Sequence, residues 1–227
     1  MLIRISRLLS PASRRYPGTP PLGITAFRSL DHGDASNASL ITVHSHAGTH
    51  LDVPRHFCID GLTVTDIFRK DLVLEPTICV DATVDGDGRI SPTNLDPMVH
   101  EENDVRALLV RTGVGDPDRE RRSHDLGSQL WIDPSLPSFL RSLWPDLRLF
   151  GIDTLSVSSP AHRQEGHACH REFLCRTPPI LLLEDLDLSH PRLCGRLWRL
   201  RLIPWIVAPI DGVPVVALLE DIAGGVR

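Results

Sequence analysis

Residues 43–57 read VHSHAGTHLDVPRHF and hold four of the eleven histidines of the chain. His46, His50, Asp52 and His56 all stand at even positions. On a helix His50 and Asp52 would lie about 200° apart, whereas on an extended chain all even positions share one face. The alternate positions are apolar: Val43, Ala47, Leu51, Val53 and Phe57. The pattern predicts an extended, half-buried segment with a polar site on one side.

The polar groups of this segment are candidate metal ligands. Imidazole and carboxylate suit zinc or manganese, and a single carboxylate among histidines can bridge two ions. Ten residues of straight strand would span about 33 Å, so the segment must curl, and Gly48 and Pro54 are placed to bend it. A lone histidine is more often an ordinary hydrogen-bonded side chain, and we interpret His44 in that way. Three histidines and an aspartate on one face favour metal binding.

The rest of the chain predicts a mixed α/β domain. Short β-rich runs flanked by turn residues lie at 39–43, 77–82, 107–111, 148–152, 180–183, 202–207 and 213–219. Helical spacing marks residues 135–143 and 161–174. Residues 114–130 are polar and arginine-rich, which indicates an exposed loop or insertion. Neither flank of this segment looks able to fold independently, so we expect one domain over residues 1–227.

Composition excludes several classes of protein. The 227 residues are 41% hydrophobic and 23% charged, which argues against wholesale disorder. No apolar run approaches the roughly 18 residues of a membrane span. A net charge of −5 without a basic stripe argues against a nucleic-acid partner. The five scattered cysteines predict reduced thiols, and with no signal-peptide pattern they predict a cytoplasmic protein.

A longer motif lies within the histidine-rich segment. The pattern His-x-Gly-Thr-His-x-Asp-x-Pro-x-His-Phe, here residues 46–57, resembles the signature of the metal-dependent cyclase superfamily, which includes bacterial kynurenine formamidases and isatin hydrolases. Further similar segments are ISRLLSPASRRYPGTPP at 5–21, LLVRTG at 108–113, LRLFGIDTLSV at 147–157 and ILLLEDL at 180–186. The resemblance implies the swivelling β/β/α fold of that family, with a mixed sheet and few helices.

The resemblance also implies roles for individual residues. His46, His50 and Asp52 would bind a first metal ion, with Asp52 bridging to a second. Glu184 would contact the metals as well, and His56 would be the general acid/base rather than a ligand. The implied cofactor is Zn²⁺, as one ion or two, with Mn²⁺ as an alternative.

The distal histidine ligand is less sharply defined. It falls in AHRQEGHACHREFL, where His170 matches best and His162 and His167 remain alternatives. A structural zinc site that combines these histidines with Cys169 and Cys175 is disfavoured by its irregular spacing. The resemblance thus implies that His170 completes the metal site.

The substrate pocket departs from the family pattern. Tyr16, the only tyrosine of the chain, replaces the tryptophan that covers an aromatic substrate in the formamidases. Ser158 stands where the family has an aspartate, and the C-terminal Pro-Val-Arg reads Pro214-Val215-Val216. The metal scaffold matches and the pocket is altered, with Tyr16 as the predicted substrate-binding residue.

These features together predict a metal-dependent hydrolase of an amide bond. The expected substrate is a small aromatic amide, either an aryl-formamide or a cyclic amide, cleaved by activated water with His56 as the acid/base. A cyclase or dehydratase of a biosynthetic pathway is one alternative, and a non-catalytic protein that keeps a metal for structure is another. The resemblance also implies a homodimer or homotetramer.

Overall fold

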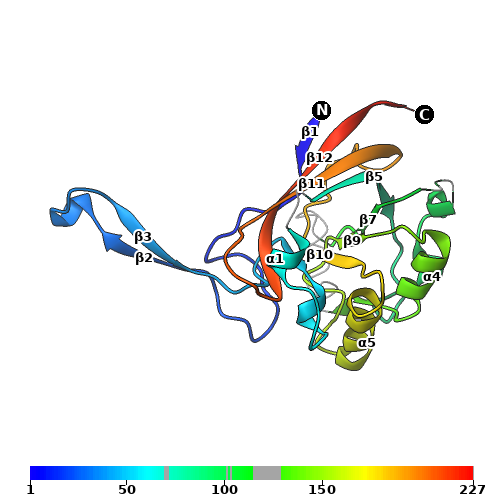
Figure 1. The fold of residues 1–227 in the computed structure, drawn as a ribbon, viewed down its shortest axis with the longest axis horizontal. Helices are drawn as coiled ribbons and strands as arrows, with labels where there is room; N and C mark the ends of the chain where they lie inside the picture. Colours follow the sequence, from blue (N-terminus) through cyan, green and yellow to red (C-terminus); the bar gives the residue numbers. More distant parts are fainter. Residues whose placement is uncertain (69–71, 101, 103, 115–128, 227) are drawn as a thin grey trace.

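The computed structural model describes residues 1–68, 72–100, 102, 104–114 and 129–226. Its body is an eight-stranded sheet with the order β1-β12-β11-β5-β7-β9-β10-β4 (Figure 1). The strands are β1 (Leu2–Arg4), β4 (His50–Asp52), β5 (Leu72–Asp81), β7 (Ala107–Arg111), β9 (Leu149–Ile152), β10 (Leu181–Glu184), β11 (Arg196–Pro204) and β12 (Gly212–Val226). The expected mixed sheet with few helices is confirmed.

The centre of the sheet is parallel and buried. Strands β5, β7, β9 and β10 run parallel to one another in that order. Their short apolar runs are buried on both faces, which is typical of parallel strands covered on each side. Ala107 and Leu109 point into one apolar core, whereas Leu108 and Val110 point into a second one. The sheet therefore separates two cores.

The histidine-rich segment closes this sheet on itself. Strand β4 pairs antiparallel with β10 on one side and with β12 on the other. The register places His50 opposite Glu184 of β10 and opposite Pro214 of β12. The result is a partly closed, barrel-like sheet in which the polar segment lies at the point of closure.

Two helices cover one side of the sheet. Helices α4 (Leu136–Leu143) and α5 (Arg163–Leu174) lie together in Figure 1 and contribute Leu136, Leu140 and Phe173 to the second core. Pro137 stands in the first turn of α4, where its missing N–H has no intrahelical partner to lose. A third helix, α1 (Val64–Ile67), starts with a capping box between Thr63 and Asp66. Smaller strands β6 (Arg89–Ile90) and β8 (Trp131–Ile132) pair parallel beside α5.

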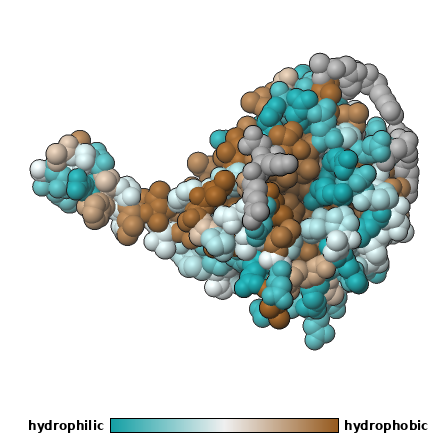
Figure 2. All heavy atoms as spheres, in the orientation of Figure 1, coloured by the Kyte–Doolittle hydropathy of each residue, from teal (hydrophilic) through white to brown (hydrophobic). Residues whose placement is uncertain are grey.

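A two-stranded arm projects from the body. Strands β2 (Gly23–Arg28) and β3 (Ala38–Thr42) form a separate two-stranded sheet, and Figure 1 shows them extending well away from the body of the protein. The short turn Leu30–His32 follows β2. Figure 2 shows hydrophobic surface along the arm and at its base. The large apolar side chains that are more than half exposed on it are Ile24, Phe27, Leu30, Leu40 and Ile41.

One sequence prediction about the strands needs correction. The run expected at 202–207 belongs to β11, which spans Arg196–Pro204 because Trp198, Leu200 and Leu202 are buried in alternation with arginines. The curl of the histidine-rich segment is located as expected: Gly48 has a left-handed φ of 61°, and Pro54 starts a 3-10 turn, Pro54–His56. Most of the loop expected at 114–130 lies outside the described residues, since 115–128 are not described.

The prediction of reduced thiols is wrong for two of the five cysteines. Cys58 and Cys175 form a disulfide, whereas Cys79, Cys169 and Cys194 are free. The partners are 117 residues apart, and only the packing of α5 against the histidine-rich segment brings their Cα atoms to 5.8 Å. The cytoplasmic location stays a prediction, and the cysteines no longer support it. Across the described ranges, no helix combines the length and apolarity needed to cross a bilayer.

Candidate metal centre

The β4–β10 register builds the first cluster of ligands. Because His50 and Glu184 are opposite each other, His50 Nε2 lies 3.4 Å from Glu184 Oε2. Asp52, two residues along the same strand, presents Oδ1 at 3.3 Å from the same nitrogen. All three side chains are at most 4% exposed. These ligand atoms lie close enough together to hold one ion.

Helix α5 brings a fourth group to this cluster. His170 Nε2 lies 3.8 Å from both Asp52 Oδ2 and Glu184 Oε1. His167, one turn earlier, lines the cavity and contacts Phe57 at 5.5 Å between ring centroids. His162 precedes the helix and stacks on Trp131 instead. Of the three candidate histidines, the structure brings His170 to the carboxylates.

Backbone carbonyls orient both buried imidazoles. His50 Nδ1 pairs with the carbonyl of Gly48 at 2.8 Å, and His170 Nδ1 pairs with that of Gly166 at 2.7 Å. A neutral ring whose Nδ1–H donates to a carbonyl leaves Nε2 free for a metal ion, which is the arrangement found behind metal-binding histidines. Burial opposes a charge on His50, but Asp52 and Glu184 outweigh it and raise its pKa, so a cation would displace the Nε2 proton of this ring. Both rings therefore offer Nε2 towards the carboxylates of Asp52 and Glu184.

The spacing of these atoms fits a divalent cation. Asp52 Oδ2 is fully buried and has no hydrogen-bond partner among the described residues, which is costly for a carboxylate oxygen. The separations of 3.3–3.8 Å are too long for good hydrogen bonds. They match ligand atoms placed about 2.1 Å from a shared ion in a tetrahedral arrangement, which lie roughly 3.4 Å apart. The donor set of two imidazoles and two carboxylates suits zinc or manganese.

A second cluster shares Asp52 with the first. His46 Nδ1 pairs with Asp52 Oδ1 at 2.6 Å, and His46 Nε2 pairs with Asp211 Oδ2 at 2.8 Å. His56 Nδ1 contacts the same Asp211 oxygen at 3.0 Å. Ligand atoms of His46, Asp52 and His56 lie close enough to hold a cation as well. Asp52 thus stands between two groups of candidate ligands.

The sequence interpretation missed Asp211. It lies 165 residues from His46 and immediately precedes β12, in an Asp-Gly pair that reads as an ordinary turn. The pairing of Gly212 with Asp52 brings it to the histidines. No local spacing indicates this contact, because it depends on the closure of the sheet by β4.

The ionisation of the cluster follows from burial and charge. Burial opposes a charge on His46, but the carboxylates of Asp52 and Asp211 outweigh it and raise the pKa of His46 to about 9. Burial would also raise the pKa of Asp52, yet His46 and His50 hold it well below its usual range. At His170 burial dominates over Glu184 and Asp52 and lowers the pKa, so this imidazole is neutral at pH 7.

The candidate metal ligands border a small cavity. Its volume is about 260 Å³, and Tyr16, Phe57 and His44 lie on its wall beside the ligands. Tyr16 is half-buried in the loop that follows β1, so the predicted substrate-binding residue faces the predicted metal site. Glu184 is held at the floor by the Val157 N–H, which donates to Oε1 at 2.8 Å.

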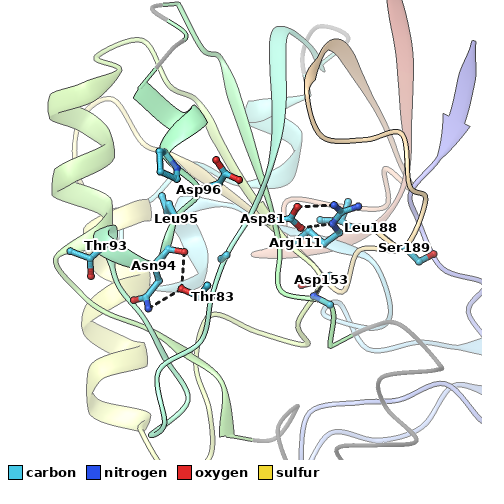
Figure 3. Close-up of a pocket in the computed structure, with 13 residues that line it drawn as sticks. Asp81, Thr83, Thr93, Asn94, Leu95, Asp96, Arg111, Asp153, Leu188 and Ser189 are labelled. Carbon is cyan, nitrogen blue, oxygen red and sulfur yellow. Dashed lines mark hydrogen bonds and ion pairs between the residues drawn. The ribbon is translucent and has the colours of Figure 1, made fainter.

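A larger cavity of about 700 Å³ lies at the ends of β5, β7 and β9. Figure 3 shows Arg111 and Asp81 turned towards each other there, with two hydrogen bonds of 2.6 and 2.8 Å. Asp153 accepts hydrogen bonds from Thr112 and Gly113. Because the charged groups of this cavity are already paired, we place the functional site at the smaller cavity.

Comparisons with known proteins show a family and a fold. The Cyclase family model, described as "Putative cyclase", matches residues 3–159. Kynurenine formamidase of Bacillus anthracis is 30% identical over 220 residues, covering 97% of both chains, and that of Geobacillus thermodenitrificans is 28% identical over 218 residues, covering 96% of both. Isatin hydrolase A from Labrenzia aggregata, solved with benzyl benzoate, superposes with a TM-score of 0.75 at 20% identity and covers 96% of this chain and 93% of its own.

Proposed function

The chain belongs to the cyclase family, and we propose on this basis that it is a metal-dependent hydrolase of a non-peptide C–N bond, with an aryl-formamide or a cyclic amide as substrate. The observation that carries the proposal is the buried Oδ2 of Asp52, which accepts no hydrogen bond from any described residue although Asp52 stands between two clusters of candidate ligands. Its relatives named kynurenine formamidase align along nearly the whole chain, which supports the C–N hydrolase class.

His50, Asp52, Glu184 and His170 would hold one divalent ion, and His46 would hold a second together with Asp52. When bound, such an ion supplies Lewis acidity, which polarises a carbonyl group and acidifies water. Neutral His170 needs to lose no proton to bind a cation, because burial already lowers its pKa.

His56 is the proposed proton carrier. Its Nδ1 is held by Asp211 Oδ2 at 3.0 Å, so Nε2 is the atom left to accept a proton. Its side chain is 27% exposed and lines the cavity, so substrate can reach it. His56 takes the proton from the attacking water and returns it to the leaving nitrogen. Asp211 holds the ring in the tautomer that this transfer requires.

The cavity favours a single aromatic ring. Its volume of about 260 Å³ is below the usual range for drug-sized ligands. Tyr16 and Phe57 offer aromatic surface on its wall. A planar ring would contact these aromatic side chains while its amide carbonyl faces the candidate ligands.

The test is turnover of N-formylkynurenine and of isatin by purified protein before chelation, after chelation, and after Zn²⁺ or Mn²⁺ is restored. We expect chelator-sensitive hydrolysis that a metal restores and that His56→Ala lowers by 100-fold or more, in line with about 10²–10⁴-fold for general acid–base catalysis. A product that has gained one water identifies hydrolysis. A product of unchanged or lower mass would favour the cyclase or dehydratase alternative.

We also propose that two copies of the chain associate through the arm. An isolated two-stranded hairpin is marginal in water, and this one exposes a row of large apolar side chains. A second exposed apolar stretch lies on the body at Ile203, Trp205, Ile206 and Val207. A two-fold arrangement in which each arm covers the other copy's stretch would bury both surfaces.

Light scattering coupled to size exclusion tests this association. We expect a dimer for the wild type and a monomer for Phe27→Asp combined with Leu40→Asp. Leu2→Asp, an exposed position on β1, is the matched control and should stay dimeric. A wild-type protein that is monomeric at micromolar concentration contradicts the proposal.

A further inference from the structure

The disulfide joins the two segments that carry the proton carrier and the distal ligand. Cys58 lies two residues after His56, in the turn that follows Pro54–His56. Cys175 is the C-cap of α5, five residues after His170. The bond therefore links both sides of the cavity across 117 residues of sequence.

Besides the disulfide, ring contacts link the His56 turn to the helix: His56 and Phe57 both contact His170, and Phe57 also contacts His167. The backbone hydrogen bonds of this turn close within the turn itself, from Arg55 N to Leu62 O, from Cys58 N to Pro54 O and from Gly61 N to Cys58 O. Across the gap, the Phe57 ring stacks on the His170 ring, with centroids 4.4 Å apart and planes 19° apart. The covalent bond at Cys58 lies next to this stack.

The helix is anchored independently on its other side. Arg141 of α4 donates to the carbonyls of Glu172 and Phe173 at the end of α5. Phe173 itself is buried in the second core. The end of α5 is thus fixed by the core and by α4. Because the disulfide joins Cys58 to this fixed end, it restricts the movement of the turn that carries His56.

We propose that the Cys58–Cys175 disulfide is a clamp that positions His56 and Phe57 against His170, so that the metal centre keeps its full affinity only in the oxidised protein. The proposal rests on the proposed function. Reduction by a dithiol breaks the S–S bond with two electrons and two protons, yields the Cys58 and Cys175 thiols, and converts the dithiol to its cyclic disulfide. Cys58 and Cys175 are positioning residues, since neither lies among the ligands.

The other cysteines provide internal controls. Cys79 and Cys194 lie 3.7 Å apart between their sulfur atoms, next to Arg111 and the larger cavity. Cys169 is buried in α5 and is not exposed to reagents in the folded protein. Alkylation of the denatured, unreduced protein followed by peptide mapping should leave only Cys58 and Cys175 unlabelled and joined.

The decisive measurement is Co²⁺ and Zn²⁺ binding by the wild-type protein in its oxidised and dithiol-reduced forms, and by Cys58→Ala/Cys175→Ala. We expect at least a tenfold loss of affinity for the reduced and doubly substituted proteins, the scale seen when groups behind metal ligands are removed. We also expect a changed Co²⁺ visible spectrum. Cys194→Ala should keep the disulfide, the affinity and the sensitivity to reduction.

Circular dichroism on the same samples separates positioning from unfolding. If the double variant is unfolded, the metal affinity of the reduced wild-type protein, measured while that protein is still folded, decides whether the disulfide positions the site. Equal affinity and equal Co²⁺ spectra in both redox forms overturn the clamp, as does a peptide map with Cys58 and Cys175 free. An oxidised protein that binds metal in this way and hydrolyses no amide overturns the proposed function and leaves the clamp standing.

Discussion

Gly166→Ala tests whether the close approach of α5 to the loop after β9, at Ser158, assembles the candidate metal centre. A Cβ atom at Gly166 would overlap Ser158 Oγ and Ser158 Cβ and would lie 2.8 Å from Ser158 Cα. Carbon atoms in ordinary contact are about 3.5 Å apart, so the helix or the loop must move by about 1 Å. Gly166 also supplies the carbonyl that orients His170. The substitution therefore displaces a ligand without removing one.

The energetic cost follows from the same contacts. Overpacking costs about 1–3 kcal/mol, and the upper part of this range applies because the obstacle includes backbone. Alanine favours a helix over glycine by about 1 kcal/mol, which offsets part of the cost. The free energy of unfolding should therefore fall by about 2 kcal/mol, which corresponds to a Tm lower by about 4–8 °C in a protein of this size. Metal affinity should fall by about 10–100-fold, since the orientation of His170 is disturbed.

Differential scanning calorimetry and competition with a chelating dye measure the two effects. Gly86→Ala is the matched control, because its added Cβ meets nothing within 4 Å and its backbone is not left-handed. Its Tm should stay within about 2 °C of the wild type and its metal affinity should not change. A Gly166→Ala protein that unfolds and binds metal like the wild type would refute this account of how α5 is positioned.

Asp211→Asn should lower turnover by about 10–100-fold with little change in KM, because the uncharged amide holds His56 less firmly and can turn its NH₂ group towards Nδ1, which favours the wrong tautomer; steady-state kinetics test this, and an unchanged kcat excludes the role. In the metal-free protein, His46 has its pKa raised by its carboxylate partners to about 9 from an unfolded value of 6.5. Protonated His46 therefore adds up to about 3 kcal/mol to the free energy of unfolding. This contribution is complete below pH 6.5 and is lost as the pH rises through about 9, so urea unfolding of the chelated protein should show a falling free energy of unfolding between these pH values. Arg111→Ala removes the ion pair with half-exposed Asp81 and should lower the free energy of unfolding by about 1 kcal/mol or less. Metal affinity should not change, and a large loss of bound metal would show that the larger cavity is energetically coupled to the metal site.

The local part of the site was predictable because it lies within one short segment. Alternation places His50 and Asp52 on one face of a strand whatever surrounds it, and Leu51 on the other face enters the core. Gly48 and Pro54 bend the segment through their own backbone preferences. Such features depend on nearest neighbours in the chain, so the sequence alone indicates them. The short buried strands of the parallel centre were predictable for the same reason.

The remote contributions depend on register and packing. Glu184 ends an apolar run like many exposed strand ends, and only the β4–β10 register sets it opposite His50. His170 is distinguished from His167 and His162 by the rotation of α5 on the sheet. Nothing in their own neighbourhoods marks these residues, and the family resemblance was the only indication at the level of sequence.

Asp211 and the disulfide were decided by the tertiary structure alone. Asp211 reaches His46 across 165 residues, and Cys58 reaches Cys175 across 117. Both contacts form because β4 closes the sheet and α5 packs beside it, which are outcomes of the whole core rather than of any segment. The sequence by itself determined which chemical groups the chain carries and which of them share a strand. The free energy of burying two apolar cores determined which distant groups those strands would meet.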